Sequence, residues 1–261
     1  MNLQLDAGLG EAYKSRSQAA RKITESWGTK NLFCLACPSD LLISETANTP
    51  VRDYTCPRCG ATYQLKSKNG SFGKVVQNSA YRPKMAAIAN GRVPHYAFLQ
   101  YSRATWSVTD LFVVPGHLIS AGVIQMRNPL KKGARREGWV GSNILLGQLP
   151  ADARIPIILQ GSVREPSRVR DDWRRYIFLQ SDKRGRGGWG ADILSCVHKL
   201  QRETGDREFT LRAFYARFNQ EIALWHPDNH HIEAKIRQQL QVLRDGGVLR
   251  FLRRGRYQVM S

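Results

Sequence analysis

The stretch VRDYTCPRCGATYQLKSK, residues 51–68, combines a metal-binding motif with the residue types of a reactive centre. It contains one Cys-x2-Cys knuckle, and the segment CLAC contains another, with eighteen residues between the two. This paired spacing is typical of a tetrahedral four-thiolate zinc site, in which four protein ligands leave no open position for water. We therefore expect a structural zinc ion held by Cys34, Cys37, Cys56 and Cys59.

The residues around the second knuckle predict two short strands, 52–55 and 61–67, joined by the knuckle. Side chains alternate along a strand, so Gln64 and Lys66 should share one face, with Tyr63 and Leu65 turned toward the core. Asp53 lies on the preceding strand, which should bring its carboxylate to the same place.

Phosphodiester hydrolysis needs such a set. Asp53 and the amide oxygen of Gln64 are suitable oxygen ligands for Mg²⁺, and Lys66 could orient the attacking water or offset charge in the transition state. The spacing alone is also compatible with a solvated strand edge that carries a charge pair.

A helix is predicted over Ser17–Trp27, where apolar residues recur on one face and Ser17 could cap the start. It carries Glu25, a candidate additional catalytic carboxylate. The alternative is that Glu25 pairs with Arg21, four residues earlier on the same helix face.

Further along, a helix over 78–89 and strand-like runs at 95–102, 109–116 and 154–160 indicate an α/β core with a mixed sheet and flanking helices. No apolar run reaches membrane-spanning length, and the N-terminal residues lack a secretion-signal pattern. We expect a cytoplasmic protein with no membrane partner and no small-molecule substrate.

Residues 181–190, SDKRGRGGWG, are predicted to form a linker between two domains, 1–182 and 183–261. Three helical patterns follow, the first with Cys196 on its apolar side, and then an alternating basic hairpin with its turn at residues 253–255. Leu249, Phe251, Tyr257 and Val259 should share the buried face of that hairpin. This order of elements predicts a winged helix, which binds DNA or, as the alternative, another protein.

The formal net charge of +19 favours a polyanionic partner, because each cation placed near a phosphate releases counterions. Basic residues concentrate in 127–136 and 244–256, which suggests two contacts with nucleic acid, with acidic lipid a weaker alternative. Trp139, in a basic glycine-containing loop, is the candidate for contact with exposed bases, and the alternative is that it is an ordinary core residue. The other candidates for DNA contact are Arg135, Arg136, His230, His231, Lys235, Arg237, Gln238, Arg254 and Arg256.

Four segments, YKSRSQAARKITESW, VRDYTCPRCGATYQLKSK, ARREGWVGSNI and IRQQLQVLRDGGVLRFLRRGRY, resemble the DpnI-like methyl-directed restriction endonucleases. The resemblance implies an N-terminal PD-(D/E)XK nuclease domain with a four-cysteine zinc site and a C-terminal winged helix. It also implies Mg²⁺-dependent cutting of double-stranded DNA at GATC sites with N6-methyladenine, by a bacterial enzyme expected to be a monomer. On this basis Asp53 is the acid and Lys66 the lysine of the nuclease motif, and the four knuckle cysteines are the zinc ligands.

One position departs from the family pattern, which has glutamate where this chain has Gln64. A neutral amide removes one negative charge, so Mg²⁺ should bind more weakly. Other nucleases of the broader class have glutamine here. The alternative to an endonuclease is therefore a zinc-containing, winged-helix reader of methylated DNA that does not cut.

Overall fold

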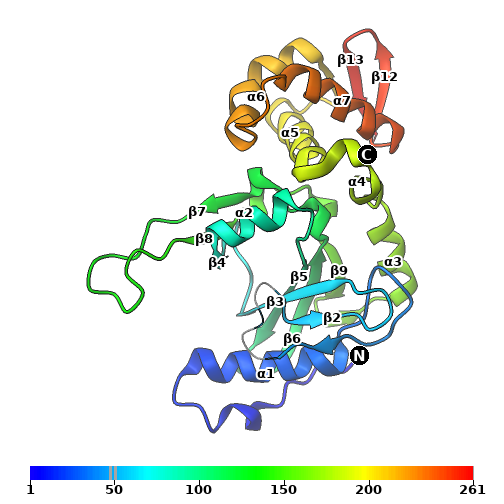
Figure 1. Cartoon of the computed structure of the whole chain (residues 1–261). Helices are drawn as coiled ribbons and strands as arrows, with labels where there is room; N and C mark the ends of the chain where they lie inside the picture. The colour runs from blue at the N-terminus through cyan, green and yellow to red at the C-terminus, as the bar shows by residue number, and fades with distance from the viewer. Residues whose placement is uncertain (47–48, 50–51, 261) are drawn as a thin grey trace. The chain divides into compact units, whose positions relative to one another are not determined.

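The structure is a computed structural model that describes residues 1–46, 49 and 52–260; Val51, at the start of the stretch quoted above, lies outside the described residues. Contacts divide the chain into two compact units that alternate along the sequence (Figure 1). The second unit joins the C-terminal segment to two segments from the middle of the chain. The first unit comprises Met1–Gly73, Pro94–Gly116 and Asp152–Arg175, and the second comprises Lys74–Val93, His117–Ala151 and Tyr176–Ser261.

The first unit is built on a mixed sheet, which confirms the predicted α/β class. Within the described ranges, seven strands take the order β1-β2-β3-β5-β6-β9-β10, with β3 parallel to β5 and the other neighbours antiparallel. The aromatic and aliphatic residues of β5 are buried on both faces, as expected for a central strand. The strands are β1 (Ile43–Ser44), β2 (Tyr54–Thr55), β3 (Thr62–Asn69), β5 (His95–Ser102), β6 (Ser107–Val114), β9 (Ile155–Leu159) and β10 (Ser162–Val163).

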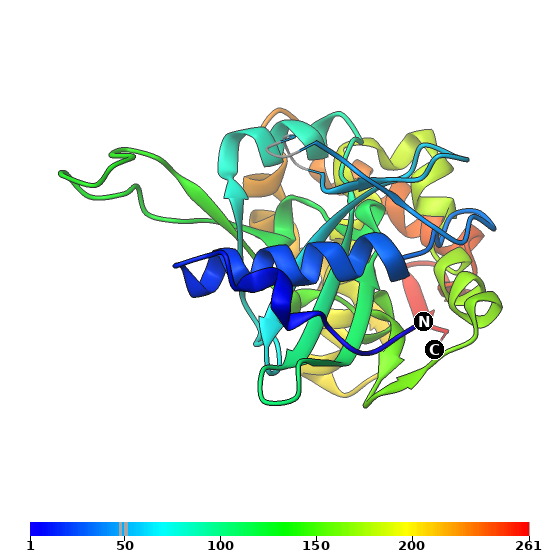
Figure 2. The same ribbon diagram turned by 90° about the horizontal axis from the view of Figure 1, so that it is seen from below.

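Two helices belong to this unit. α1 (Arg16–Asn31) lies against the sheet, with Ile23 and Trp27 buried on the apolar face that the sequence predicted (Figure 2). The expected cap is wrong: Ser15, not Ser17, occupies the N-cap position, and its side chain makes no capping hydrogen bond. α3 (Pro166–Arg174) begins with a proline, whose missing N–H costs nothing in the first turn.

The second unit contains a small antiparallel sheet of β4 (Val76–Ala80), β8 (Gly141–Ile144) and β7 (Ile124–Met126), covered by α2 (Tyr81–Ala89). The helix predicted from residue 78 begins only at Tyr81, because residues 76–80 pair with β8 instead. The loop between β7 and β8, residues 127–140, extends away from this sheet (Figures 1 and 2). It contains the first of the two predicted basic patches.

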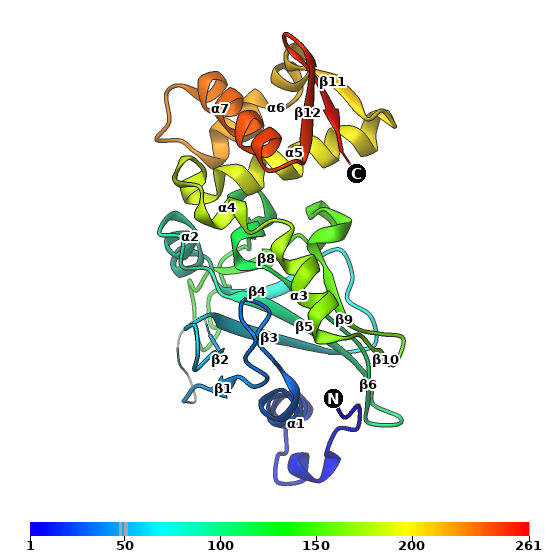
Figure 3. The same cartoon turned by 90° about the vertical axis from the view of Figure 1, so that its right-hand side faces the viewer.

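The rest of this unit is the predicted winged helix (Figure 3). Its three helices are followed by the hairpin β12–β13, and a third strand, β11, pairs with the outer side of β13. Leu249, Tyr257 and Val259 are buried as predicted, but Phe251 is 40% exposed where the hairpin register becomes irregular near its turn. The elements are α5 (Trp189–Thr204), β11 (Glu208–Thr210), α6 (Leu211–Trp225), α7 (Ile232–Asp245), β12 (Leu249–Arg253) and β13 (Arg256–Val259).

Residues 181–190, which the sequence predicted to be a linker, have helical structure. They form the end of α4 (Phe178–Ser181), a 3-10 helix η6 (Lys183–Gly188) and the start of α5. Gly190 leaves room for Leu179 and Gln239, whose side-chain atoms lie 2.8 and 3.5 Å from where its Cβ would be. The glycines therefore permit close packing here rather than flexibility. The remaining 3-10 helices are η1 (Ala7–Gly10), η2 (Gly116–Leu118), η3 (Ala121–Val123), η4 (Leu146–Gln148) and η5 (Ala151–Ala153).

A buried polar contact also ties α5 to η3. Asp192 is fully buried, accepts the backbone N–H of Gly122 at 2.9 Å and lies 2.9 Å from Nε2 of His226. Cys196, on the same helix, is buried in the core as predicted. None of the helices within the described ranges has both the length and the apolar character needed to cross a membrane.

Candidate active site and DNA interface

The β2–β3 hairpin positions the residues of the predicted reactive centre. The backbone N–H of Asp53 donates to the carbonyl of Tyr63 at 2.8 Å, which places Asp53 beside the start of β3. In return, Oδ2 of Asp53 accepts the backbone N–H of Leu65, also at 2.8 Å. These two hydrogen bonds fix the carboxylate next to the strand segment that carries Gln64 and Lys66.

Asp53 and Lys66 are both largely covered and affect each other electrostatically. Burial raises the pKa of Asp53; the N–H of Leu65 opposes the shift, and the nearby charge of Glu25 adds to it. Burial lowers the pKa of Lys66, which the negative charge of Asp53 partly offsets. The charged forms of both Asp53 and Lys66 are therefore disfavoured by desolvation, and an opposite charge close to either group reduces its cost.

Gln64 contributes an unsatisfied oxygen to the same hairpin. Its residue is 9% exposed, and Oε1 accepts no hydrogen bond from the described part of the chain. A buried carbonyl without a partner costs about 1–3 kcal/mol, so such an atom calls for a ligand. An amide oxygen and a carboxylate held by the same hairpin are ligand types that suit a hard divalent cation such as Mg²⁺, and the residues present therefore fit the metal.

Glu25 is close to this centre and is also paired with Arg21. Oε1 of Glu25 lies 2.6 Å from Nε of Arg21, which confirms the i, i+4 pair considered from the sequence. Glu25 nevertheless acts on the carboxylate of Asp53, whose pKa its charge raises. Sequence reasoning did not place Arg21 near Asp53 and Lys66, although its position on the same helix face as Glu25 was a signal.

The four knuckle cysteines form one cluster. Their sulfur atoms all lie within 4.8 Å of one another, with Cys34 and Cys59 at 3.6 Å and Cys37 and Cys56 at 3.5 Å. Tetrahedral zinc with bonds of about 2.3 Å separates its sulfur ligands by about 3.8 Å. Burial alone would raise the pKa of Cys56, but the N–H groups of Cys59 and Arg58 outweigh it and lower the pKa to about 6. The cluster therefore has the composition and geometry of a structural zinc site.

Tyr63 links this cluster to the strand that carries Gln64. Its side chain points to the opposite side of β3 from Gln64, and its hydroxyl accepts the N–H of Leu35 at 2.9 Å and lies 3.4 Å from Sγ of Cys34. Arg170 of α3 holds the same knuckle from outside by donating to the carbonyl of Cys34 at 3.1 Å. No sequence pattern pointed to Arg170, which lies 136 residues from Cys34 along the chain.

In the β7–β8 loop, Trp139 and Arg136 are in contact. The guanidinium of Arg136 lies 4.9 Å from the centre of the indole ring, and the ring also lies where a Cβ on Gly141 would be. Trp139 is half-buried, whereas Arg135 is exposed. The loop thus holds one aromatic ring in a defined position with cations around it, as an interface with bases requires.

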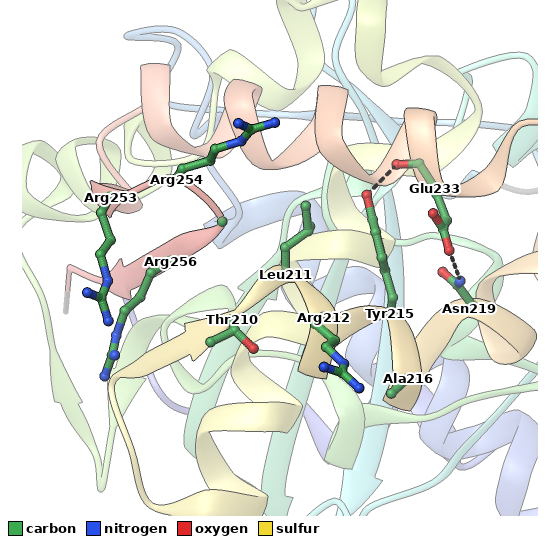
Figure 4. Close-up of a pocket in the computed structure, with 11 residues that line it drawn as sticks. Thr210, Leu211, Arg212, Tyr215, Ala216, Asn219, Glu233, Arg253, Arg254 and Arg256 are labelled. Atoms are coloured by element: carbon green, nitrogen blue, oxygen red, sulfur yellow. Dashed lines mark hydrogen bonds between the residues drawn. The ribbon is translucent and has the colours of Figure 1, made fainter.

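The winged helix contains an open pocket of about 760 Å³ between the start of α6, the start of α7 and the wing (Figure 4). Within it, the hydroxyl of Tyr215 donates to the carbonyl of Glu233 at 3.0 Å and accepts Nε of Arg237 at 3.0 Å. Two predicted DNA contacts, Arg254 and Arg256, line this pocket, as do two arginines that the sequence did not single out. The lining comprises Thr210, Leu211, Arg212, Tyr215, Ala216, Asn219, Glu233, Arg253, Arg254, Gly255 and Arg256.

The predicted DNA contacts on α7 and in the two residues before it differ in their exposure to solvent. His230, His231 and Arg237 are exposed. Lys235 is half-buried, and its Nζ donates to the carbonyl of Arg184 at 2.8 Å and to Oε1 of Gln238 at 2.7 Å. In the free protein, therefore, Lys235 and Gln238 are held within the winged helix.

These features agree with comparisons against known families. The family model described as DpnI, the Dam-replacing family, matches residues 1–182 of this chain. A second family model, described as the Dam-replacing HTH domain, matches residues 185–259. The first match includes the cysteine cluster and the β2–β3 hairpin, and the second includes the winged helix. The chain therefore belongs to the DpnI, or Dam-replacing, family and carries its helix-turn-helix DNA-binding domain.

Proposed function

We propose that this protein is a methyl-directed endonuclease that cuts double-stranded DNA at GATC sites carrying N6-methyladenine. The observation that carries the nuclease activity is the buried Oε1 of Gln64, which lacks a partner among the described residues, on the hairpin that also fixes Asp53 and Lys66. The preference for methylated GATC rests on family membership. We place the nuclease in residues 1–182 and DNA reading mainly in 183–261. By the family resemblance, we expect the enzyme to act as a monomer in the bacterial cytoplasm.

In this proposal, Asp53 and Gln64 hold Mg²⁺. When bound, the ion supplies Lewis-acid polarisation of the phosphate and lowers the pKa of a water ligand. Lys66 stands beside Asp53 and either orients the attacking water or offsets the negative charge of the transition state. Asp53 must be ionised, and its two hydrogen bonds to β3 hold it in place.

Zinc has a structural role, because four thiolates leave no position for water. Cys34, Cys37, Cys56 and Cys59 would bind it, and Tyr63 would support Cys34. The ion thereby fixes the hairpin from the side opposite to Gln64.

Methylated adenine would be read by two surfaces. Trp139 offers an aromatic face on which burial of one methyl group contributes about 1 kcal/mol. In the winged helix, Arg254 and Arg256 would meet phosphates. His231, at the N-cap of α7, and the exposed Arg237 on α7 would meet base edges. Lys235 and Gln238 would have to leave their internal hydrogen bonds to contact DNA.

The alternative function is a reader of methylated DNA that does not cut. Gln64 favours it, because the site has one carboxylate fewer than the pattern implied by the family resemblance. The net charge, the winged helix and the cysteine cluster fit both functions equally well.

One experiment separates them. The protein is incubated with Mg²⁺ and with plasmid prepared either with or without adenine methylation at GATC. We expect fragments only from the methylated plasmid, and none when Asp53→Ala replaces the wild type, although this variant should still retain methylated DNA. Retention of methylated plasmid without any fragments would establish the reader, and cutting by Asp53→Ala would show that the site is elsewhere.

A further inference from the structure

Helix α1 is docked against the strands of the candidate active site by one of its faces. The hydroxyl of Tyr54 on β2 donates to the carbonyl of Glu25 at 2.8 Å, and the hydroxyl of Thr24 lies 3.0 Å from Oγ of Ser67 on β3. Gly28, one turn further on, has no room for a Cβ beside the ring of Tyr54. Residues 21, 24, 25 and 28 share this face by helical spacing. The docking therefore fixes where Arg21 and Glu25 lie relative to Asp53.

Arg21 is paired but only partly engaged. Its Nε contacts Oε1 of Glu25 at 2.6 Å, and among the described residues no other hydrogen bond to its guanidinium is formed. The side chain is 60% exposed, compared with 35% for Glu25. An arginine has five N–H donors in a planar fork, so most of this fork faces solvent and is suited to a phosphate.

The charges at the site explain why this pair matters. Asp53 and Glu25 carry two negative charges and Lys66 and Arg21 two positive ones, and Arg21 interacts with both Asp53 and Lys66. Such a balanced cluster attracts a divalent cation only weakly. Because residue 64 is a neutral amide, Glu25 is the nearby source of the second carboxylate that a Mg²⁺ site needs.

We propose that Arg21 is a substrate-phosphate-binding residue that changes partner: it holds Glu25 in the absence of DNA and binds the phosphodiester when DNA arrives, which frees Glu25 to complete the Mg²⁺ site. This inference rests on the proposed nuclease function. It makes assembly of the metal site depend on DNA, because the phosphate removes a cation from the carboxylate that the metal requires. Glu25 would then supply the negative charge that the neutral side chain of Gln64 does not.

The test measures Mg²⁺ binding to the full-length protein without DNA, by calorimetry, together with the kinetics of cutting. Arg21→Gln should tighten Mg²⁺ binding by about three- to tenfold, the size expected from removing one nearby positive charge. The same variant should raise the KM for methylated plasmid, because a phosphate contact is lost. Glu25→Gln should weaken Mg²⁺ binding, and adding Arg21→Gln to it should bring a smaller gain than Arg21→Gln brings alone, because Glu25 is no longer there to be freed.

Lys22→Gln is the matched control, since it removes the same charge from the neighbouring exposed position on a different face of α1. It should leave Mg²⁺ binding and KM at wild-type values. The proposal that Arg21 changes partner is wrong if the Arg21→Gln variant binds Mg²⁺ as the wild type does, binds it more weakly, or does not bind it at all. If the wild-type protein still cuts methylated plasmid in these cases, the proposed nuclease function stands and only the Arg21 proposal fails. If the wild-type protein never cuts methylated plasmid, the proposed nuclease function itself is wrong.

Discussion

Gln64 is the residue whose chemistry most strongly affects the candidate active site. Its amide oxygen is buried and has no hydrogen-bond partner among the described residues, and its neighbour Asp53 already bears a charge that burial disfavours. In a site of this kind an amide is a compromise. It provides a metal ligand but adds no second buried carboxylate that would repel Asp53 when no metal is present.

Gln64→Glu should therefore bind Mg²⁺ more tightly and be less stable without it. We expect the Mg²⁺ concentration for half-maximal cutting to fall by about tenfold, because one more negative charge faces the cation. With a chelator present at neutral pH, the Gln64→Glu variant should unfold at a lower temperature than the wild type. Excess Mg²⁺ should restore the unfolding temperature. Gln64→Leu, which has no ligand oxygen, is the comparison variant. An unchanged Mg²⁺ requirement in Gln64→Glu would show that residue 64 does not bind the metal.

At the scale of elements, the β2–β3 hairpin lies between the cysteine cluster and the candidate catalytic residues. Tyr63 turns toward the cysteine cluster and Gln64 away from it, so the same strand faces the zinc site on one side and the candidate catalytic residues on the other. A structural zinc ion contributes about 10–16 kcal/mol of binding energy to folding. Within the hairpin, β2 has only two residues and pairs with β3 at two positions, so β2 has little pairing of its own to hold it.

Cys56→Ser should therefore remove both the metal and the activity. We expect zinc content to fall from one ion per chain to near zero and cutting to be lost, with a lower unfolding temperature. Cys196→Ala is the control, because this buried cysteine lies on α5 and outside the cluster. It should keep its zinc and its activity. Full cutting by zinc-free Cys56→Ser would mean that the knuckles do not hold the hairpin.

At the scale of the whole molecule, the net charge of +19 should make DNA binding strongly salt-dependent. Arg254 lines the wing pocket and has no ion-pair partner among the described residues. Arg254→Ala should weaken binding to methylated and unmethylated DNA by similar factors and reduce the slope of log K against log salt by about 1. Fluorescence anisotropy at several salt concentrations measures both quantities.

Arg217→Ala is the matched control in the same winged helix. Its guanidinium is held by Glu203 at 2.8 Å and lies 3.6 Å from Glu221, so it releases no counterion when DNA binds. The salt slope of this variant should equal that of the wild type. Equal slopes for all three proteins would place the wing away from the DNA backbone.

The parts of the fold with local signals were predictable. Helical spacing and strand alternation gave α1, α5, α6, α7 and the hairpin β12–β13, because each pattern lies within a few turns or pairs of residues. β11 was missed because three residues are too few for a period; it is a strand only because the outer side of β13 offers backbone partners. The 3-10 helix at residues 183–188 was not predicted, since glycines that permit close packing cannot be told from glycines that permit flexibility.

The sequence by itself determined the chemistry that this protein has to use: four thiols at zinc spacing, an acid, an amide and a lysine around them, and a basic winged helix. Only the tertiary structure decided that the amide oxygen is buried with no partner in the described part of the chain, that Arg170 supports a knuckle, and that Arg21 and Glu25 stand near Asp53. The physical reason is that residue types and spacings are local, whereas burial and charge proximity depend on how a helix docks on a sheet.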